Sequence, residues 1–562
     1  MHRLLLGILL LLCIPQAVCG ITVTAFCPDP YLPYDPDEFI ILTGQGSLDG
    51  WTITDGEGTL SFPPGTWIDG DLIIARQAEA YKITHGTYPD FEWENSTPAV
   101  PGLDHVGRFI LANAADEIEL YYHGELMFEV HWPRDLRPRR GQVHRYIDGV
   151  WNPRPFMIGQ SDFEPIRVED VAATLFVSPD SSYEVFEEAI RSADRSIQVS
   201  VYEFTHTGIG DLLADAHNRG VEVHILLEGI PVGGVCPDQT HLLTRLNQSG
   251  IPVDLMGSPG SGEPTRYRFM HAKYLVIDSE SVILTSENLK ESGIPYTGVR
   301  GNRGWGVWIH DTRVAEYFGM VFAEDSTGWD IFPITLASTR HEPAEYRVTP
   351  QQSRFAPLRI EGATVTPVIS PDTSYLVPAL VNEAEHSLAI QQAYIRNWTR
   401  NAPNPWLDAA TGAAGRGVDV RIILDSTWYN LQGERGNDYI VGLVNTHAAE
   451  TDHALEARLF DPDRGGASRI HTKGVIVDDR AVLISSINWN ENSPMNNRET
   501  GVIIEHPDAA AYYMRVFEDD WSNEYTLPGD VISTDDLLKP AIAVAVILFF
   551  AGIVIGRRMK EK

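Results

Sequence analysis

The sequence predicts an α/β protein built from a duplicated unit, with an all-β domain before it and a transmembrane helix near its C-terminal end. Three observations predict the α/β and all-β parts: amphipathic helical patterns that alternate with apolar runs, an ordered internal repeat, and short alternating segments confined to the N-terminal part. At 562 residues the chain is too long for one hydrophobic core, so several domains are expected.

Residues 1–20 have the pattern of a cleaved secretory signal peptide. They read "MHRLLLGILLLLCIPQAVCG", with a positively charged start, an apolar run and small residues before the expected cleavage point. An uncleaved N-terminal anchor is the alternative. Export would place the rest of the chain in an oxidising compartment.

Residues 21–155 have the rhythm of an all-β sandwich. Gly, Pro, Asp and Asn separate the segments "DEFIILTG", "GWTITD", "DLIIARQ", "GRFILAN", "DEIELYY" and "LMFEVHW". The stretch "LDGWTITDGEGTLSFPPGTWI", together with the later "DEIELYYHGE", resembles a lamin-tail domain, a small immunoglobulin-like sandwich. The resemblance implies an accessory or interaction module without catalysis.

The region from 165 to 530 repeats itself, with a first unit at 165–335 and a second at 360–530. "SPDSSYEVFEEAIRSADRSIQVSVYEF" begins at Ser178, and "SPDTSYLVPALVNEAEHSLAIQQAYI" begins at Ser370. Further along, "GVEVHILLEG" from Gly220 matches "GVDVRIILDS" from Gly417. Each pair predicts an amphipathic helix, a buried strand and then a strand after a helix, so the region is a duplicated α/β unit.

The last repeated phrase carries titratable groups at the entrance of an apolar run. It reads "MHAKYLVIDS" from Met270 and "IHTKGVIVDD" from Ile470. Histidine and lysine two positions apart on a strand share one face. The next runs, "SVILTSEN" and "AVLISSIN", predict a neighbouring strand that returns an asparagine toward the histidine and lysine.

These residue types suit chemistry on phosphodiesters. A neutral imidazole can attack phosphorus, and a second, protonated imidazole can protonate the leaving alkoxide. Lysines, asparagines and hydroxyls can bind the charged oxygens. One histidine cannot fill both roles in one step, so the two halves are expected to face each other.

The two phrases match the HxK(x)4D(x)6GSxN signature of the phospholipase D superfamily, with Thr285 and Ser485 in place of the usual glycine. This resemblance covers the 165–530 region. It implies duplicated α/β domains, with mixed sheets flanked by helices, and one active site at their pseudo-twofold interface. It also implies a covalent phosphohistidine, no metal and no cofactor. Because one chain supplies both halves, no obligate dimer is needed.

The motif is carried over residue by residue. The predicted catalytic residues are His271, Lys273, Asp278, Asn288, His471, Lys473, Asp478, Asn488 and Glu499. The role of the two aspartates looks more structural than catalytic. The predicted substrate-binding residues are Ser286, Ser486, Arg268 and Arg469.

The halves differ at one position of this resemblance. Glu499, in "NNRETGVII", stands where family members resembling bacterial endonucleases keep a carboxylate on the catalytic histidine, so we expect it to orient His471. The first half has Gly304 there. The expected stand-ins for an orienter of His271 are Glu203 and Glu287.

Residues 538–556 predict a transmembrane helix. They are uncharged from Pro540 to Gly556 and end in a basic tail, 557–562. The tail should be cytoplasmic, which makes the chain a single-pass protein of the cell membrane with an extracellular ectodomain. A buried core helix is the alternative. Outside the signal peptide, Cys27 and Cys236 either form one disulfide or remain two free thiols.

The net charge of −34 argues against a broad electrostatic grip on nucleic acid, although a local basic cleft is compatible with it. The leading hypothesis is an exported, membrane-anchored phosphodiesterase that hydrolyses or transfers phospholipid headgroups. One alternative is a metal-independent endonuclease of the same superfamily, with nucleic acid as substrate. An alternative of another class is a surface adhesion or scaffold protein with a degenerate site.

Overall fold

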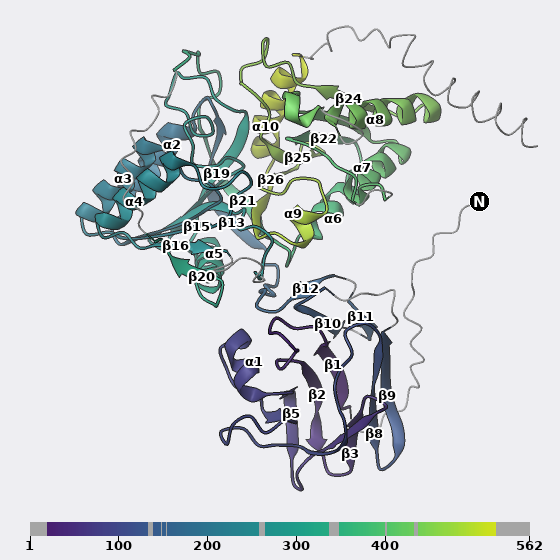
Figure 1. Cartoon of the computed structure of the whole chain (residues 1–562). Helices are drawn as coiled ribbons and strands as arrows, with labels where there is room; N and C mark the ends of the chain where they lie inside the picture. The colour runs from purple at the N-terminus through teal and green to yellow at the C-terminus, as the bar shows by residue number, and fades with distance from the viewer. Residues whose placement is uncertain are drawn as a thin grey trace, which may run out of the picture.

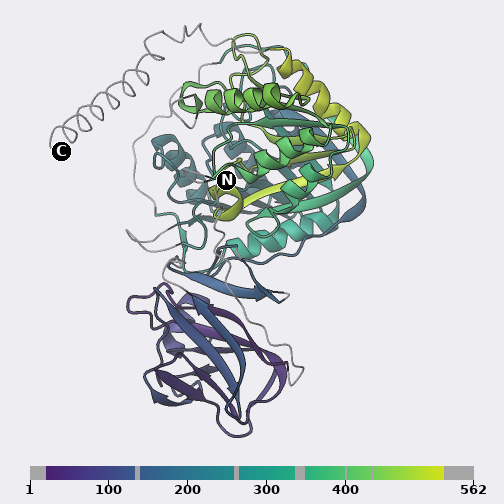
Figure 2. The same ribbon diagram turned by 90° about the vertical axis from the view of Figure 1, so that its right-hand side faces the viewer.

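The computed structural model describes residues 20–132, 139–147, 149–152, 154–257, 265–335, 348–398, 402–431 and 436–523. The predicted transmembrane helix and nearly all of the predicted signal peptide lie outside these residues. Within them, no helix is both long and apolar enough to cross a membrane. A β domain lies at one end of the molecule and a larger α/β body at the other (Figures 1 and 2).

The N-terminal β domain consists of two sheets that share one hydrophobic core. One sheet has the order β11-β10-β1-β2-β5-β6, with β12 beside β10, and the other has the order β7-β4-β3-β8-β9. The elements are β1 (Thr22–Cys27), β2 (Phe39–Ser47), β3 (Trp51–Thr54), β4 (Gly58–Ser61), β5 (Trp67–Ala75), α1 (Ala78–His85), β6 (Phe91–Glu92), β7 (Asp104–Gly107), β8 (Asp116–Tyr122), β9 (Glu125–Trp132), β10 (Gln142–Ile147), β11 (Val150–Trp151) and β12 (Phe156–Met157). The β character is as predicted, apart from helix α1. The lamin-tail identity stays a prediction.

One predicted strand of this domain, "GRFILAN", is not a strand. Its apolar side chains are buried as expected, with Phe109 4% and Leu111 0% exposed. Its backbone amides, however, donate to carboxylates: the amide of Ile110 to Asp55 at 2.7 Å and that of Leu111 to Glu38 at 3.1 Å. The alternating burial therefore comes from an extended segment whose donors are satisfied by side chains instead of a neighbouring strand.

The α/β body contains the two repeated halves. The first has β13 (Val168–Ser178), α2 (Ser182–Ser192), β14 (Ser196–Val201), α3 (Thr207–Asn218), β15 (Glu222–Glu228), α4 (Pro237–Gln248), β16 (Val253–Met256), β17 (Lys273–Ile277), β18 (Ser281–Thr285), β19 (Gly304–His310), α5 (Thr312–Asp325) and β20 (Ile331–Pro333). The second has β21 (Leu358–Ser370), α6 (Leu376–Asn382), β22 (Ser387–Gln392), α7 (Pro405–Gly415), β23 (Asp419–Leu424), the 3₁₀ helix η1 (Trp428–Asn430), α8 (Asn437–Thr451), β24 (Leu455–Leu459), β25 (Lys473–Val477), β26 (Ala481–Ser485), α9 (Asn492–Met495), β27 (Glu499–Glu505) and α10 (Pro507–Trp521).

The two halves share a single 15-stranded sheet. Its order is β20-β16-β15-β14-β17-β18-β19-β13-β21-β27-β26-β25-β22-β23-β24, so the strands of one half repeat in reverse order beyond the β13–β21 junction. That junction is antiparallel and pairs Ala173 with Ile360. The sequence predicts mixed sheets in two units, and the structure joins them edge to edge into one. In each half, three parallel strands (β14-β15-β16 and β22-β23-β24) continue into antiparallel ones.

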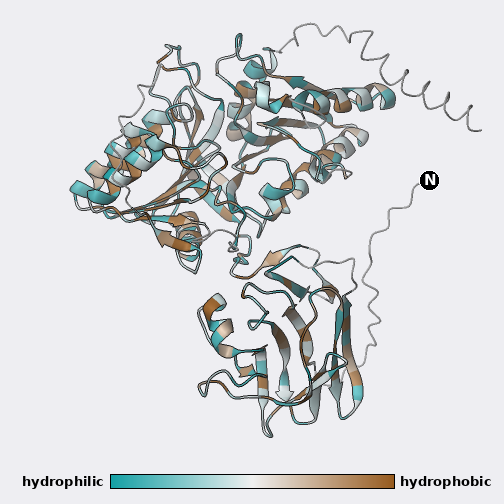
Figure 3. Ribbon diagram, in the orientation of Figure 1, coloured by the Kyte–Doolittle hydropathy of each residue, from teal (hydrophilic) through white to brown (hydrophobic). Residues whose placement is uncertain are grey.

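Helices cover both faces of this sheet. Helices α5 and α10 share one core cluster with strands of both halves, whereas α2 to α4 and α6 to α8 cover the opposite face of their own half. Strands β17 and β25 are buried at every position, as their uninterrupted apolar runs predict. In Figure 3 the hydrophobic colour concentrates on the central strands and on the inner sides of the helices.

Two buried arginines connect the halves. The guanidinium of Arg303, fully buried, contacts Asp180 of its own half at 2.7 Å and Asp520 of α10 at 2.9 Å. Arg498 occupies the equivalent place in the second half, where it contacts Asp372 at 3.4 Å and Asp325 of α5 at 2.9 Å. Each arginine thus joins one carboxylate from each half. Buried charges of this kind persist only when they are paired.

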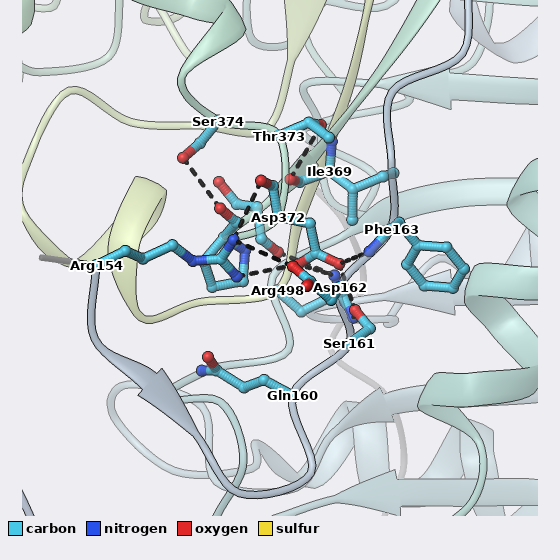
Figure 4. Close-up of polar contacts among 12 residues, drawn as sticks. Arg154, Gln160, Ser161, Asp162, Phe163, Ile369, Asp372, Thr373, Ser374 and Arg498 are labelled. Atoms are coloured by element: carbon cyan, nitrogen blue, oxygen red, sulfur yellow. Dashed lines mark hydrogen bonds and ion pairs between the residues drawn. The ribbon is translucent and has the colours of Figure 1, made fainter. Parts of the chain in front are cut away.

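The segment that leaves the β domain is tied to the same network. The Ser161 hydroxyl donates to Asp372 at 2.5 Å, and the Phe163 amide donates to the same carboxylate at 2.9 Å. Arg498 donates to the Ser161 oxygen at 2.5 Å. Figure 4 shows these contacts, with Arg154 also directed at Asp372. The linker therefore docks on the seam between the halves and fixes the β domain to the α/β body.

Cys27 and Cys236 are both free thiols in this structure. Cys27 is buried in β1 of the β domain, and burial raises its pKa well above the ordinary value. Cys236 precedes helix α4 of the α/β body. Of the two alternatives left open by the sequence, the structure shows the unpaired one.

Replacing Arg498 with methionine should destabilise the protein by about 3–5 kcal/mol, because Asp325 would remain buried without its paired cation and Asp372 would be left with the 3.5 Å contact with Arg154. Urea unfolding measures the change in the free energy of unfolding. The matched control is Arg359→Met, since the exposed Arg359 pairs with the exposed Glu361 and should change stability by less than about 1 kcal/mol. Equal effects of the two substitutions would contradict the stabilising role of the buried network.

Candidate functional site

The two His-x-Lys segments meet at the seam between the halves. The His271 amide donates to the carbonyl of Arg498 at 2.8 Å, and the His471 amide donates to the carbonyl of Arg303 at 2.8 Å. Met270 and Ile470 complete two short parallel bridges with the same arginines. Each histidine segment is therefore held by the backbone of the other half, and this exchange brings both histidines and both lysines into one site.

The two lysines open strands β17 and β25 and are buried. Burial lowers the pKa of Lys273 to about 8, although Glu499, Glu203 and Glu287 act against this. Burial, and then the positive charge of Lys273, lower the pKa of Lys473 well below its ordinary value. Each ammonium donates to the carbonyl of its own histidine, at 2.7 Å and 2.6 Å. An anionic phosphate between them would favour the charged form of both.

His271 is held by an ionised carboxylate. Its Nδ1 lies 2.6 Å from Glu499, which is fully buried and also accepts a hydrogen bond from the Ser486 hydroxyl at 2.6 Å. Burial alone would raise the pKa of Glu499, but His271, Lys273 and Ser486 together hold it below its ordinary value. Burial lowers the pKa of His271. Because Glu499 is the acceptor, the proton of the neutral ring is on Nδ1 and the lone pair is on Nε2.

The prediction that Glu499 orients His471 is therefore wrong. Glu499 begins strand β27 immediately after Arg498, whose backbone pairs with Met270 and His271 of the other half. The crossed pairing directs Glu499 to His271. Spacing along one half of the sequence does not reveal this.

His471 faces a different carboxylate, Glu287. Its Nδ1 lies 3.3 Å from Glu287, which accepts a hydrogen bond from the side-chain amide of Asn302 at 2.9 Å. Burial raises the pKa of Glu287 to about 7, opposed by the nearby cations Lys473 and Arg469. Burial, followed by the charge of Lys473, lowers the pKa of His471 well below its ordinary value.

Neither expected stand-in lies on His271. Glu287 faces His471 instead, and Glu203 contacts Asn288 at 3.0 Å and Lys290 at 3.2 Å. Both of those expectations are wrong for the same reason, because each carboxylate was sought within the half that carries its histidine.

The two carboxylates reach their histidines from different positions in the two halves. In the second half the carboxylate comes from Glu499 on β27, and the equivalent position in the first half is Gly304 on β19. A Cβ at Gly304 would lie 2.5 Å from atoms of the Glu287 side chain. Glu287, next to Ser286 on the adjacent strand end, therefore occupies the space that a side chain at 304 would need. Asn302 and Asn497 hold the two carboxylates in the same way, at 2.9 Å and 3.0 Å.

Asp278 and Asp478 do not contact the site: they have the structural role that the sequence favoured, and their place among the catalytic residues is wrong. Both adopt left-handed backbone conformations, with φ of 56° and 50°, at the opposite ends of β17 and β25 from the histidines. Each carboxylate accepts three backbone amides at 2.7–2.9 Å; the donors are Asp194, Arg195 and Ser196 for one and Glu385, His386 and Ser387 for the other. This cap fixes the start of strands β14 and β22.

The predicted substrate-binding serines are engaged inside the protein. Ser286 and Ser486 are both fully buried. The Ser286 oxygen accepts the Trp305 amide at 3.1 Å, and the Ser486 hydroxyl donates to Glu499. Substrate binding by these serines stays a prediction; in the structure Ser486 positions Glu499, and Ser286 fixes the strand end.

The remaining predicted residues keep accessible or unsatisfied polar groups near the site. The Oδ1 atoms of Asn288 and Asn488 are buried and accept no hydrogen bond within the described part of the chain. Arg469 donates to Asn302 at 3.1 Å and acts electrostatically on Glu287 and His471. Arg268 is exposed. Binding of substrate by these residues stays a prediction.

Sequence reasoning missed a tyrosine beside the first histidine. The ring of Tyr202 lies 4.7 Å from the ring of His271, and the Lys273 ammonium lies 5.6 Å from it. Tyr394 is the equivalent residue, in "QQAYI" where the first half has "VSVYEF". The repeated tyrosine was a usable signal, as was the Asn-Arg pair shared by "GNRG" and "NNRE".

No cluster of three or more His, Cys, Asp or Glu side chains suited to a metal ion occurs among the residues that the structure describes. What the arrangement does provide is two imidazoles with opposed carboxylates and two ammonium groups. Such a set can attack a phosphodiester, protonate the leaving oxygen and bind the charged oxygens.

Comparison with known proteins agrees with this chemistry. The family model described as "Cardiolipin synthase, PLD-like domain" matches residues 186–326 and 377–521, one stretch in each half and together half of the chain. Fold and site thus define a duplicated α/β enzyme acting on phosphodiesters. The chain belongs to the phospholipase D-like family, which makes it a phosphodiesterase or phosphatidyltransferase.

The individual relatives share 30% or less of their residues with this chain over the aligned stretches. Phospholipase D Z of Dictyostelium discoideum is 24% identical over 399 residues, 62% of this chain and 86% of the relative. Mitochondrial cardiolipin hydrolase of Mus musculus is 30% identical over 106 residues, 19% of this chain and 41% of that relative. Among solved structures, phosphatidylserine synthase of Haemophilus influenzae aligns with a TM-score of 0.48 and 13% identity, covering 66% of this chain and 93% of that one.

The two glutamates should respond to substitution with opposite signs at alkaline pH. The pKa of Glu287 is raised to about 7, so its contribution to stability is present below its unfolded pKa and lost as pH rises through about 7. As the pH rises from 5 to 8, the free energy of unfolding of Glu287→Gln should therefore rise by about 1–3 kcal/mol relative to that of the wild type.

The pKa of Glu499 is lowered, so its contribution is present above its unfolded pKa. The free energy of unfolding of Glu499→Gln should be about 2 kcal/mol lower than that of the wild type at pH 8. Urea unfolding of both variants at pH 5 and pH 8 tests the pair, and changes of the same sign at pH 8 would contradict the assigned protonation states.

Proposed function

We propose that the chain is an exported, membrane-anchored enzyme that hydrolyses or transfers the headgroup phosphodiester of phospholipids through a covalent phosphohistidine. The observation that carries the proposal is the meeting of two imidazoles and two lysines, one set from each half, at a single seam. The signal peptide and the transmembrane helix enter this proposal as sequence predictions.

His271 is the nucleophile in this proposal. Glu499 holds its proton on Nδ1, which leaves Nε2 free to attack phosphorus. The Nε2–P bond forms as the bond from phosphorus to the leaving alcohol oxygen breaks, and the oxygen takes a proton from His471. His471 then removes a proton from water or from an acceptor alcohol, whose oxygen displaces Nε2 from phosphorus.

The two histidines suit these unequal roles because their carboxylates differ. An ionised Glu499 stabilises positive charge that develops on His271 during attack. Glu287, with a pKa of about 7, holds a proton beside Nδ1 of His471 near neutral pH. As His471 gives its Nε2 proton to the leaving oxygen, its Nδ1 takes the proton of Glu287, so the ring stays neutral. Lys273 and Lys473 bind the phosphate oxygens, and the negative charge of the bound group raises their pKa values in turn.

Phospholipid is the proposed substrate class. The family description names cardiolipin synthase, and the relatives are named phospholipase D Z and cardiolipin hydrolase. The net charge of −34 disfavours the long-range attraction that a nuclease uses for its substrate. The retained histidines and lysines of both halves disfavour a scaffold with a degenerate site.

The substrate assignment is tested with the full chain in detergent micelles and EDTA. We expect headgroup release from phosphatidylcholine or phosphatidylglycerol and no cleavage of single-stranded DNA, because the proposed site needs no metal. Cleavage of DNA with both lipids intact would select the endonuclease alternative. Activity abolished by EDTA would contradict the mechanism.

The histidine roles are tested with phosphorus-labelled lipid. His471→Ala should accumulate label on His271, since attack can still occur while the later steps lose their acid and base. His271→Ala should carry no label. Both substitutions should lower turnover by about 10²–10⁴-fold. Equal labelling of the two variants would exclude a unique nucleophile.

A further inference from the structure

We propose that the mouth of the site carries an apolar rim that inserts into the surface of a phospholipid bilayer; this rests on the proposed function and names the form in which the substrate is met. The rim consists of Ile230, Val232 and Val235 in the first half and Trp428 and Tyr429 in the second. Val232 is 76% exposed and Trp428 is 69% exposed.

The first half of the rim is connected to His271. Glu228 ends strand β15, and its carboxylate accepts the amide of Met270, the residue before His271, at 2.6 Å. Four residues later the Val232 amide donates to the Tyr202 hydroxyl at 2.7 Å, and the Tyr202 ring lies against His271. The loop that exposes Ile230, Val232 and Val235 is thus held at the entrance to the site.

The second half of the rim has the same relation to His471. Asp425 follows strand β23, and its carboxylate accepts the amide of Ile470, the residue before His471, at 3.0 Å. Four residues later the Tyr429 hydroxyl accepts a hydrogen bond from Arg469. Equivalent loops of the two halves therefore present apolar side chains on either side of the paired histidines.

Single exposed apolar residues are ordinary, but a group gathered at the entrance of a site indicates an interaction surface. The occupant is inferred from the residue types. Trp and Tyr, with apolar rings and polar edges, favour the headgroup level of a bilayer, and Val and Ile gain free energy by entering the acyl region.

The charges fit the same occupant. Arg268 is exposed three residues before His271, and Arg469 donates to Tyr429 of the rim, so both add positive charge beside it, which suits the phosphate groups of a bilayer. A single-stranded nucleic acid could stack on Trp428 and Tyr429, but it would gain nothing from Ile230, Val232 and Val235. The aliphatic part of the rim therefore favours lipid.

Insertion of the rim into a bilayer can be measured independently of enzyme activity. The full chain is mixed with vesicles of equal parts phosphatidylcholine and phosphatidylglycerol whose acyl chains are brominated, and quenching of tryptophan fluorescence is recorded. Trp428→Phe should remove a quenched component of the emission. The matched control is Trp67→Phe, since Trp67 is 65% exposed on the β domain. The predicted transmembrane helix 538–556 contains no tryptophan and adds no signal of its own.

Activity gives the second readout. The double variant Val232→Ser, Trp428→Ser should lose about tenfold in rate on bilayer phospholipid and keep its rate on a monomeric short-chain phospholipid. The control is Val106→Ser, Trp67→Ser, which changes equally exposed residues of the β domain and should keep both rates.

The outcomes separate the rim from the proposed function. The proposal that the rim inserts into lipid would be overturned if Trp428→Phe left the quenching unchanged, or if the double variant lost activity equally on both lipid forms. It would also be overturned if the double variant changed its oligomeric state, because the rim would then be a contact between copies of the chain. Quenching that depends on Trp428, in a chain inactive on both lipid forms, would keep the rim and overturn the phospholipid reaction.

Discussion

Two reciprocal backbone pairings fix the α/β body and its site. The amide of each histidine donates to the carbonyl of an arginine from the other half, and the guanidinium of that arginine is buried between one carboxylate from each half. The same residues therefore join the halves and set the separation of the histidines. Neither half can move relative to the other without breaking buried ion pairs, so the site is preorganised by the network that stabilises the fold.

Electrostatic balance within the site follows from this crossing. Two lysines, an arginine and two histidines are crowded at the seam, and two glutamates partly neutralise them. Burial depresses the pKa values of the lysines, and the buried glutamates offset this only in part. An anionic diester adds negative charge beside them, so substrate binding and the protonation of the lysines reinforce each other.

Much of the architecture followed from the sequence because duplication made the pattern visible twice. Strands β17 and β25, their neighbours β18 and β26, and the helices between the repeated phrases lie where the repeats predict them. The pairing of Glu499 with His271 did not follow, because a repeat shows what each half contains and not how the halves exchange contacts. The aspartates of the motif lie on the strand ends away from the histidines, as the five-residue strands between them and the histidines require. In the β domain, "GRFILAN" has the predicted burial pattern but does not form a strand, because its backbone amides donate to carboxylates.

The position of Glu287 opposite Gly304 shows what covalent linkage of the halves allows. In an assembly of two identical chains, any substitution appears at both symmetry-related positions, so both histidines would keep identical carboxylates. A single gene that encodes both halves removes this restriction. One half can move its carboxylate to a neighbouring strand end while the other keeps it, and the symmetry of the site is broken at one pair of residues without disturbing the shared sheet.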